Sequence, residues 1–180
     1  MIALRRIAGE RPWRLVSVQA LNRFYSKGGE VVANWMTKQD RDQSIADNVA
    51  YVAAVLSEIA EESGAARPIV YAGFSQGVGM AYRAAAFAGR PVDGLIVLAG
   101  DVPPEVAPLA AQLPKILLGR GTEDQWYTAG KAARDLEVLH AAGVEVVEQV
   151  FEGGHEWHDA FVAHAGDFLD QLIRARTVSR

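Results

Sequence analysis

The feature that most constrains the fold is an alternation between short, continuous apolar runs and longer stretches whose apolar residues have helical spacing. Runs rich in Val, Ile and Leu, without polar residues at alternate positions, are typical of strands buried on both faces of a parallel sheet. Most of the apolar runs are continuous in this way, and strands are predicted at Leu15–Ala20, Pro68–Gly73, Gly94–Gly100, Lys115–Gly119 and Val144–Phe151.

Helical patterns separate these runs. Apolar residues recur at steps of three and four within Asp42–Glu62, Thr128–Ala142 and Glu156–Ala175, and Gly143 is a suitable cap for the second helix. No linker, repeat or low-complexity segment divides the 180 residues. The sequence therefore predicts a single α/β domain over residues 1–180, with a mostly parallel sheet flanked by helices.

Composition excludes several classes of partner and site. The net charge is −4, and no cluster of Lys and Arg interleaves with aromatic residues, so we expect no nucleic-acid partner and no electrostatic membrane anchor. No apolar run is long enough to span a membrane, and Arg5 and Arg6 interrupt any signal-peptide core. The absence of cysteine excludes disulfides, thiolate metal sites and a cysteine nucleophile, and fits a cytoplasmic location.

A serine motif follows the second apolar run. Residues 73–77 read Gly-Phe-Ser-Gln-Gly, the G-x-S-x-G pattern in which a serine occupies a sharp turn from strand to helix. We expect both glycines to exclude bulk from the turn, and Gly79 and Ala81 to keep the helix start slim. The turn predicts Ser75 as a nucleophile and the backbone N–H of Gln76 as an oxyanion donor. The alternative is an ordinary strand-to-helix turn.

A serine nucleophile needs a general base, and the sequence offers four histidines. His155 follows the last predicted strand through Gly153 and Gly154, which form a loop able to return the imidazole to the nucleophile. His158 is the reserve candidate. His140 and His164 lie in helical patterns and are expected to be structural or solvated.

The third member of a triad is an acid that orients the base. Asp124 follows the predicted strand Lys115–Gly119 and lies between the serine and His155 in the chain, so it is the preferred acid. Asp101 and Glu123 are the alternatives. Asp101 also follows a strand, but Val102-Pro103-Pro104 makes a rigid turn in which it could serve only as a cap.

Five large side chains near these positions are candidates for an acyl pocket: Trp35, Met36, Trp126, Tyr127 and Trp157. Trp126 and Tyr127 lie two and three residues after the acid, and Trp157 lies two residues after the base. Ordinary core or rim packing is an equal alternative for each.

Several segments carry a family resemblance: 73–79 (GFSQGVG), 121–124 (GTED), 151–156 (FEGGHE), and 35–52 with Trp35, Asp40, Ile45 and Asn48. Together they resemble the phospholipase/carboxylesterase family, which has the α/β-hydrolase fold and includes the acyl-protein thioesterases. The resemblance covers roughly residue 13 to the C-terminus.

The resemblance implies a serine hydrolase that cleaves small-molecule carboxylic esters or thioesters without a metal ion or organic cofactor. Ser75, His155 and Asp124 match the family's nucleophile, base and acid, and Gln76 matches the oxyanion donor.

The chain departs from this family at its N-terminus. Family members begin with further strands, one of which ends in a His-Gly loop that supplies a second oxyanion donor, whereas Met1–Ala8 resembles the helix that follows this loop, with Gly9 at its end. A strand missing between the first strand and the nucleophile strand would expose two sheet edges or force a new pairing. Either the natural protein begins further upstream, or the chain is a truncation that repacks, forms a homodimer or is inactive.

Two other functions stay open at this point. Another triad enzyme, such as a peptidase or acyltransferase, would use the same three residues. A non-catalytic α/β protein could instead bind a partner through its open sheet edge.

Overall fold

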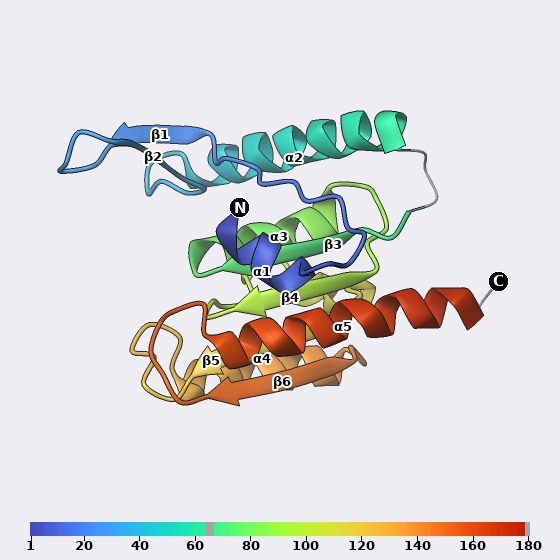
Figure 1. Ribbon diagram of the computed structural model, residues 1–180. Helices are drawn as coiled ribbons and strands as arrows, with labels where there is room; N and C mark the ends of the chain where they lie inside the picture. The colour runs from blue at the N-terminus through green and yellow to red at the C-terminus, as the bar shows by residue number, and fades with distance from the viewer. Residues whose placement is uncertain (64–66, 179–180) are drawn as a thin grey trace.

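The structure is a computed structural model that describes residues 1–63 and 67–178. At its centre lies a four-stranded parallel sheet. Its strands are β3 (Val70–Phe74), β4 (Gly94–Leu98), β5 (Lys115–Gly121) and β6 (Val146–Phe151), and they lie side by side in chain order. Every neighbouring pair is parallel. The predicted α/β class and four of the five predicted strands are confirmed (Figure 1).

Helices cover both faces of this sheet. Figure 1 shows α3 (Gln76–Phe87) and α4 (Ala129–Ala141) behind it, with α1 (Ile2–Ala8) and α5 (Asp159–Val178) in front. The long helix α2 (Arg41–Ser63) packs against α3 beyond the β3 edge, and a short 3₁₀ helix, η1 (Ala107–Gln112), connects β4 to β5.

Two glycines bring α5 close to the sheet. A Cβ atom at Gly119 would lie 2.1 Å from the ring of Phe161, and one at Gly94 would lie 2.6 Å from Leu172. Phe161 is fully buried and Leu172 is 8% exposed, so α5 closes one side of the core around β4 and β5. The packing of α5 thus fixes β4 and β5 in the core, and with them the position of the carboxyl ends of these two strands.

The predicted helices match the observed ones closely. Helix α4 ends where expected, and Gly143 takes the positive φ (77°) suited to a helix cap. The N-terminal helix and its end at Gly9 are also confirmed. Only α5 begins later than predicted, because His158 precedes its first turn and accepts a hydrogen bond from the backbone N–H of Ala160 (3.2 Å).

The first predicted strand was wrong. Residues 12–20 have no regular secondary structure, although Leu15 and Val18 are half-buried and Ala20 is buried. Within the described residues, no backbone hydrogen bond joins residues 15–20 to β3 or to any other strand. An apolar pattern reports burial, but a strand also needs a neighbour for its N–H and C=O groups.

Consequently, β3 is an edge strand with an apolar cavity beside it. This space, called the edge cavity here, has a volume of about 350 Å³ and lies between β3, segment 13–18, α1 and α3. A second cavity of about 460 Å³ extends it between segment 12–18 and α2. The resemblance led us to expect two exposed sheet edges or a new pairing; the structure has an exposed edge at β3, and the second edge does not arise because residues 15–20 form no strand.

An antiparallel hairpin precedes α2 and was not predicted. It joins β1 (Asn22–Tyr25) to β2 (Val31–Asn34) and extends away from the sheet (Figure 1). Phe24 and Tyr25 are 49% and 75% exposed, so no buried face gives the strand pattern that sequence reasoning looks for. Its turn at Gly28 and Gly29 was the available signal.

Candidate active site

Ser75 forms the joint between a strand and a helix. β3 ends at Phe74 and α3 begins at Gln76, so Ser75 alone turns the chain, with φ 53° and ψ −122°. Its N–H donates to the Leu98 carbonyl (3.0 Å), and its own carbonyl accepts from the N–H of Val78 (3.0 Å). These bonds hold a serine in a left-handed conformation that costs roughly 1–3 kcal/mol.

The glycines of the motif are not equivalent. A Cβ atom at Gly73 would lie 2.6 Å from the carbonyl oxygen of Gly77, so position 73 excludes any larger residue. A Cβ atom at Gly77 would meet nothing within 4 Å, and the expectation that both glycines exclude bulk was wrong for this one. A Cβ atom at Gly79 would lie 3.0 Å from the Arg83 guanidinium, so this glycine makes room for an arginine.

Asp124 and His155 are brought together by two loops that bond to each other. The N–H of Thr122 donates to the carbonyl of Phe151 and that of Glu123 to the carbonyl of Gly153, both at 2.8 Å. Gly121 makes this close approach possible, because a Cβ atom there would lie 2.3 Å from the Gly153 carbonyl. The result is a 2.8 Å hydrogen bond between His155 Nδ1 and Asp124 Oδ2.

The Asp124 carboxylate is enclosed and well supplied with donors. Its side chain is fully buried, and its Oδ1 accepts the backbone N–H groups of Trp126 (2.8 Å) and Tyr127 (2.9 Å). Burial alone would raise the pKa of Asp124, but these backbone bonds and the bond from His155 outweigh it and lower the pKa. Asp124 is therefore an ionised acceptor that fixes one ring nitrogen of His155.

The imidazole of His155 lies beside the serine joint. Its ring packs on Phe74, the residue before Ser75, with centroids 4.8 Å apart, and Phe74 also contacts Trp157 at 5.7 Å. Because Nδ1 bonds Asp124, Nε2 is the nitrogen left for proton transfer. Among the hydrogen bonds of the described residues there is none between Ser75 and His155; such contacts often tighten only with substrate.

Gln76 places its backbone N–H at the start of α3, where helix geometry provides no acceptor. In the part of the chain that the structure describes, this N–H has no hydrogen-bond partner. It is thus free to donate to an oxygen atom bound beside Ser75.

The alternative acids and bases lie elsewhere. Asp101 is exposed and pairs with Lys131 (3.1 Å), and Glu123 is exposed. His158 stacks on Phe151 with centroids 4.8 Å apart while it bonds the start of α5. His164 bonds the Ala160 carbonyl within α5, and His140 is exposed on α4.

The five pocket candidates divide into two groups. Trp35 and Trp157 line the edge cavity together with Gly73, Phe74 and Gly77, which flank Ser75 on both sides. Met36 is half-buried but lines neither cavity, and Trp126 is 75% exposed.

Tyr127 is a core residue, so its predicted place in a pocket was wrong. It is 1% exposed and its hydroxyl donates to Asp135 Oδ2 (3.0 Å). Burial, followed by the charge of Asp135, raises the pKa of Tyr127, which keeps the phenol protonated. The pattern of the sequence could not separate a buried aromatic residue from one that lines a pocket.

Two contacts near the site were missed by sequence reasoning. The side chain of Gln76 accepts a hydrogen bond from the backbone N–H of Trp35 (2.8 Å), and buried Arg83 pairs with Glu105 (2.7 Å). These pairs are 41 and 22 residues apart in the chain, and no spacing rule links them.

The structure offers no preformed metal centre in residues 1–63 and 67–178, where no three His, Asp or Glu side chains are grouped to hold an ion. No helix of the described chain is long and apolar enough to cross a membrane.

Comparison with solved structures shows the fold. Arabidopsis thaliana SOBER1 matches with a TM-score of 0.73 at 19% identity, covering 95% of this chain and 90% of that one. The Bacillus cereus carboxylesterase gives 0.74 at 17% identity (96% and 81% covered), and Zea mays acyl-protein thioesterase 2 gives 0.61 at 20% (81% and 74%). A search of curated proteins finds no match.

The sequence itself supplies the family. Residues 28–173 match the family model described as Phospholipase/Carboxylesterase, a range that contains the serine joint and both loops of the Asp124–His155 pair. The chain therefore belongs to the phospholipase/carboxylesterase family of α/β hydrolases and is a hydrolase of the esterase or thioesterase type.

Proposed function

We propose that the protein hydrolyses small carboxylic esters or thioesters with Ser75 as nucleophile, His155 as general base and Asp124 as the acid that orients it. The observation that carries this proposal is the 2.8 Å bond from His155 Nδ1 to the buried Asp124 carboxylate, beside a serine held at φ 53°. A strained serine next to an oriented imidazole is the arrangement that acyl transfer requires.

The reaction proceeds in two halves. Ser75 Oγ attacks the acyl carbon while His155 Nε2 takes the hydroxyl proton, and the oxyanion that forms accepts a bond from the Gln76 N–H. The imidazolium then donates its proton to the departing alcohol or thiol, which leaves an acyl-enzyme. Water, deprotonated by His155, attacks this ester and releases the carboxylic acid and free Ser75.

Asp124 contributes through the tautomer of His155. A carboxylate at 2.8 Å accepts the proton of Nδ1, so Nε2 keeps the lone pair that a general base needs. Because the pKa of Asp124 is lowered, the carboxylate stays ionised at neutral pH and stabilises the imidazolium formed at each proton transfer.

The test is labelling of the purified chain with an alkyl fluorophosphonate, which phosphonylates an activated serine. We expect the wild-type protein to be labelled at Ser75 and to hydrolyse p-nitrophenyl esters, and Ser75→Ala to do neither. Ser57→Ala, at an exposed serine of α2 that lines neither cavity, is the matched control and keeps both activities. A folded wild-type chain that is not labelled, or a Ser75→Ala variant that still turns over esters, would overturn the proposal.

A further inference from the structure

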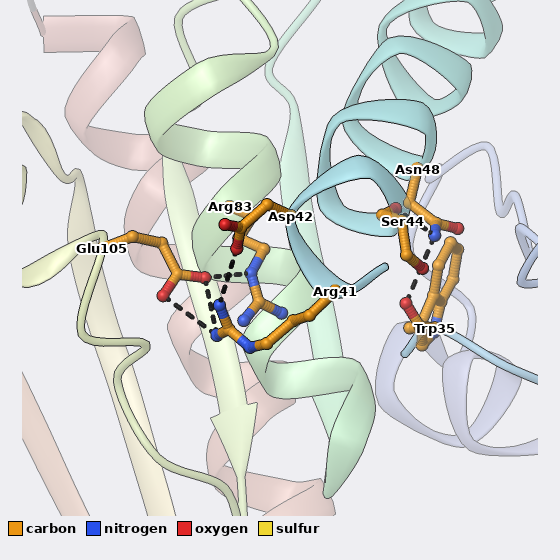
Figure 2. Close-up of polar contacts among 7 residues, drawn as sticks. All are labelled: Trp35, Arg41, Asp42, Ser44, Asn48, Arg83 and Glu105. Atoms are coloured by element: carbon orange, nitrogen blue, oxygen red, sulfur yellow. Dashed lines mark hydrogen bonds and ion pairs between the residues drawn. The ribbon is translucent and has the colours of Figure 1, made fainter. Parts of the chain in front are cut away.

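The backbone of Trp35 is held on both sides by side chains from two different helices. Its N–H donates to Gln76 Oε1 (2.8 Å), and its carbonyl accepts from Asn48 Nδ2 (3.2 Å). The same Asn48 amide donates to the Ser44 carbonyl within α2 (2.7 Å) (Figure 2). Both backbone polar groups of Trp35, a residue between a hairpin and a helix, are thus hydrogen-bonded.

Asn48 holds this position at the cost of an unsatisfied atom. It is 1% exposed, and its Oδ1 is buried without a partner among the described residues. A buried, unpaired amide oxygen costs roughly 1–3 kcal/mol, so stability alone does not favour asparagine here. Its Nδ2 makes two bonds, to the Ser44 carbonyl (2.7 Å) and the Trp35 carbonyl (3.2 Å), and only the second links α2 to another segment.

A second set of contacts holds the other end of the segment 35–41, which runs from Trp35 to the start of α2. Arg41, the first residue of α2, bonds both oxygens of Glu105 (3.2 and 3.3 Å), and Glu105 also accepts from Arg83 of α3 (2.7 Å). Figure 2 shows Arg41 and Arg83 converging on this carboxylate. Segment 35–41 therefore has two links to α3. Its Trp35 bonds Gln76, the first residue of α3, and its Arg41 is linked to Arg83 of α3 through Glu105.

The segment reaches the proposed reaction centre through Trp35 and Gln76. Gln76 supplies the proposed oxyanion N–H from its backbone while its side chain holds Trp35. Trp35 in turn lines the edge cavity with Phe74, Gly77 and Trp157, so its position sets the shape of a space that the residues on both sides of Ser75 also line.

We propose that the Gln76 side chain and Asn48 are positioning residues that hold Trp35 as the specificity-determining wall of the acyl site. This inference rests on the proposed function, because it gives the edge cavity, which Phe74 and Gly77 line on either side of Ser75, the role of taking the acyl group. Loss of either amide lets Trp35 move, and the enzyme then discriminates less between short and long acyl chains.

The experiment compares Gln76→Met, Gln76→Glu, Asn48→Ala and Trp35→Ala with the wild type. Gln76 is exposed, so Met keeps the fold and the side-chain length while it removes the acceptor, and Glu retains an acceptor. The matched control is Gln43→Met, which removes an exposed amide of α2 that bonds Asp47 (2.7 Å). Two readouts are measured: kcat and KM for p-nitrophenyl esters from acetate to decanoate, and hydrogen exchange of the Trp35 amide.

We expect Gln76→Met, Asn48→Ala and Trp35→Ala to change the decanoate-to-acetate ratio of kcat/KM in the same direction, by about tenfold. Gln76→Met also speeds exchange of the Trp35 amide by roughly fivefold, whereas Gln76→Glu keeps the wild-type exchange rate and Gln43→Met keeps both the wild-type ratio and the exchange rate. The Gln76→Met/Trp35→Ala double variant shows no further change in the ratio.

The outcomes separate the two proposals. If rates fall equally for all esters, or Trp35 exchange is unchanged in Gln76→Met, the positioning role is overturned while the triad stands. If the wild type is not labelled at Ser75, the proposed function and the acyl selectivity fall together, whatever the exchange data show.

Discussion

At the scale of single residues, the properties of His155 depend on what surrounds Asp124. Asp124 is an enclosed carboxylate with two backbone donors on one oxygen and His155 on the other. This arrangement fixes the orientation of the carboxylate without help from a second charged side chain. The proton of His155 stays on Nδ1 because the Asp124 carboxylate is a charged acceptor; a neutral group of the same shape would not hold it there.

Asp124→Asn tests this dependence. Asparagine keeps the shape but can donate its amide to His155 Nδ1, which moves the imidazole proton to Nε2, where a base needs a lone pair. We expect kcat to fall on the order of 10⁴-fold at neutral pH. A variant that keeps a tenth of the wild-type kcat would show that Asp124 is not the acid.

The same variant has a predictable stability profile. Because the folded-state pKa of Asp124 lies below its ordinary value of 3.8, its ionised form stabilises the fold at pH values above about 4, and this contribution is lost as pH falls through the folded-state pKa. Denaturation between pH 7 and pH 3 should therefore show a steeper loss in the wild type than in Asp124→Asn. Parallel curves would contradict the lowered pKa.

At the scale of elements, the joint between β3 and α3 requires glycine before Ser75, at position 73, but not after it, at position 77. Gly73 lies against the Gly77 carbonyl, and Gly100, after β4, lies against the Ser75 carbonyl, each leaving no room for a Cβ atom. Of the two glycines in the G-x-S-x-G pattern, only the one at position 73 is required by the packing of this joint.

Gly73→Ala and Gly77→Ala are a matched pair for this joint. The added methyl group at position 73 meets backbone atoms 2.6–2.8 Å away, and forcing them apart costs about 1–3 kcal/mol or more in the free energy of unfolding. At position 77 it enters open space in a helix, so stability is kept or slightly raised. Chemical denaturation checks both, and equal losses would show that the joint moves in solution.

The elements also show what the sequence could predict. The buried strands β4 and β5 appear as uninterrupted apolar runs. Because functional residues of parallel sheets follow the carboxyl ends of strands, these runs led to Asp124, and the last strand led to His155. Leu15–Ala20 also has apolar residues at strand spacing, interrupted by Ser17 and Gln19, but it lacks a neighbouring strand, a condition that lies outside any local window. The hairpin was missed for the converse reason: it has a partner strand but no buried face.

At the scale of the whole molecule, the chain is a packed sheet with an outer layer that does not close onto it. Residues 1–20 pass over the β3 side and are attached through α1 and through Arg11, whose guanidinium makes two bonds to Asp170 of α5 (2.7 and 2.8 Å). Between this layer and β3 remain cavities of about 350 and 460 Å³, whereas native cores leave few voids larger than a water molecule. The space beside β3 is therefore a reserve of stability that larger side chains could use.

A pair of alanines measures that reserve. Ala84 of α3 is 2% exposed and lines the edge cavity, whereas Ala132 of α4 is 1% exposed and lines neither cavity. Ala84→Leu places three more carbon atoms beside open apolar space and should raise the free energy of unfolding by about 0.5–2 kcal/mol, as other cavity-filling changes do. Ala132→Leu adds the same atoms to a closed core and should lower it by about 1–3 kcal/mol.

Urea denaturation of both variants beside the wild type gives the comparison, with the m-value as a check that the transition keeps its size. A gain for Ala84→Leu and a loss for Ala132→Leu mean that the space beside β3 persists in solution. If both variants lose stability equally, segment 12–20 has already closed onto β3. The acyl site would then have to lie elsewhere, because Trp35 and Trp157 would no longer face a common cavity beside Ser75.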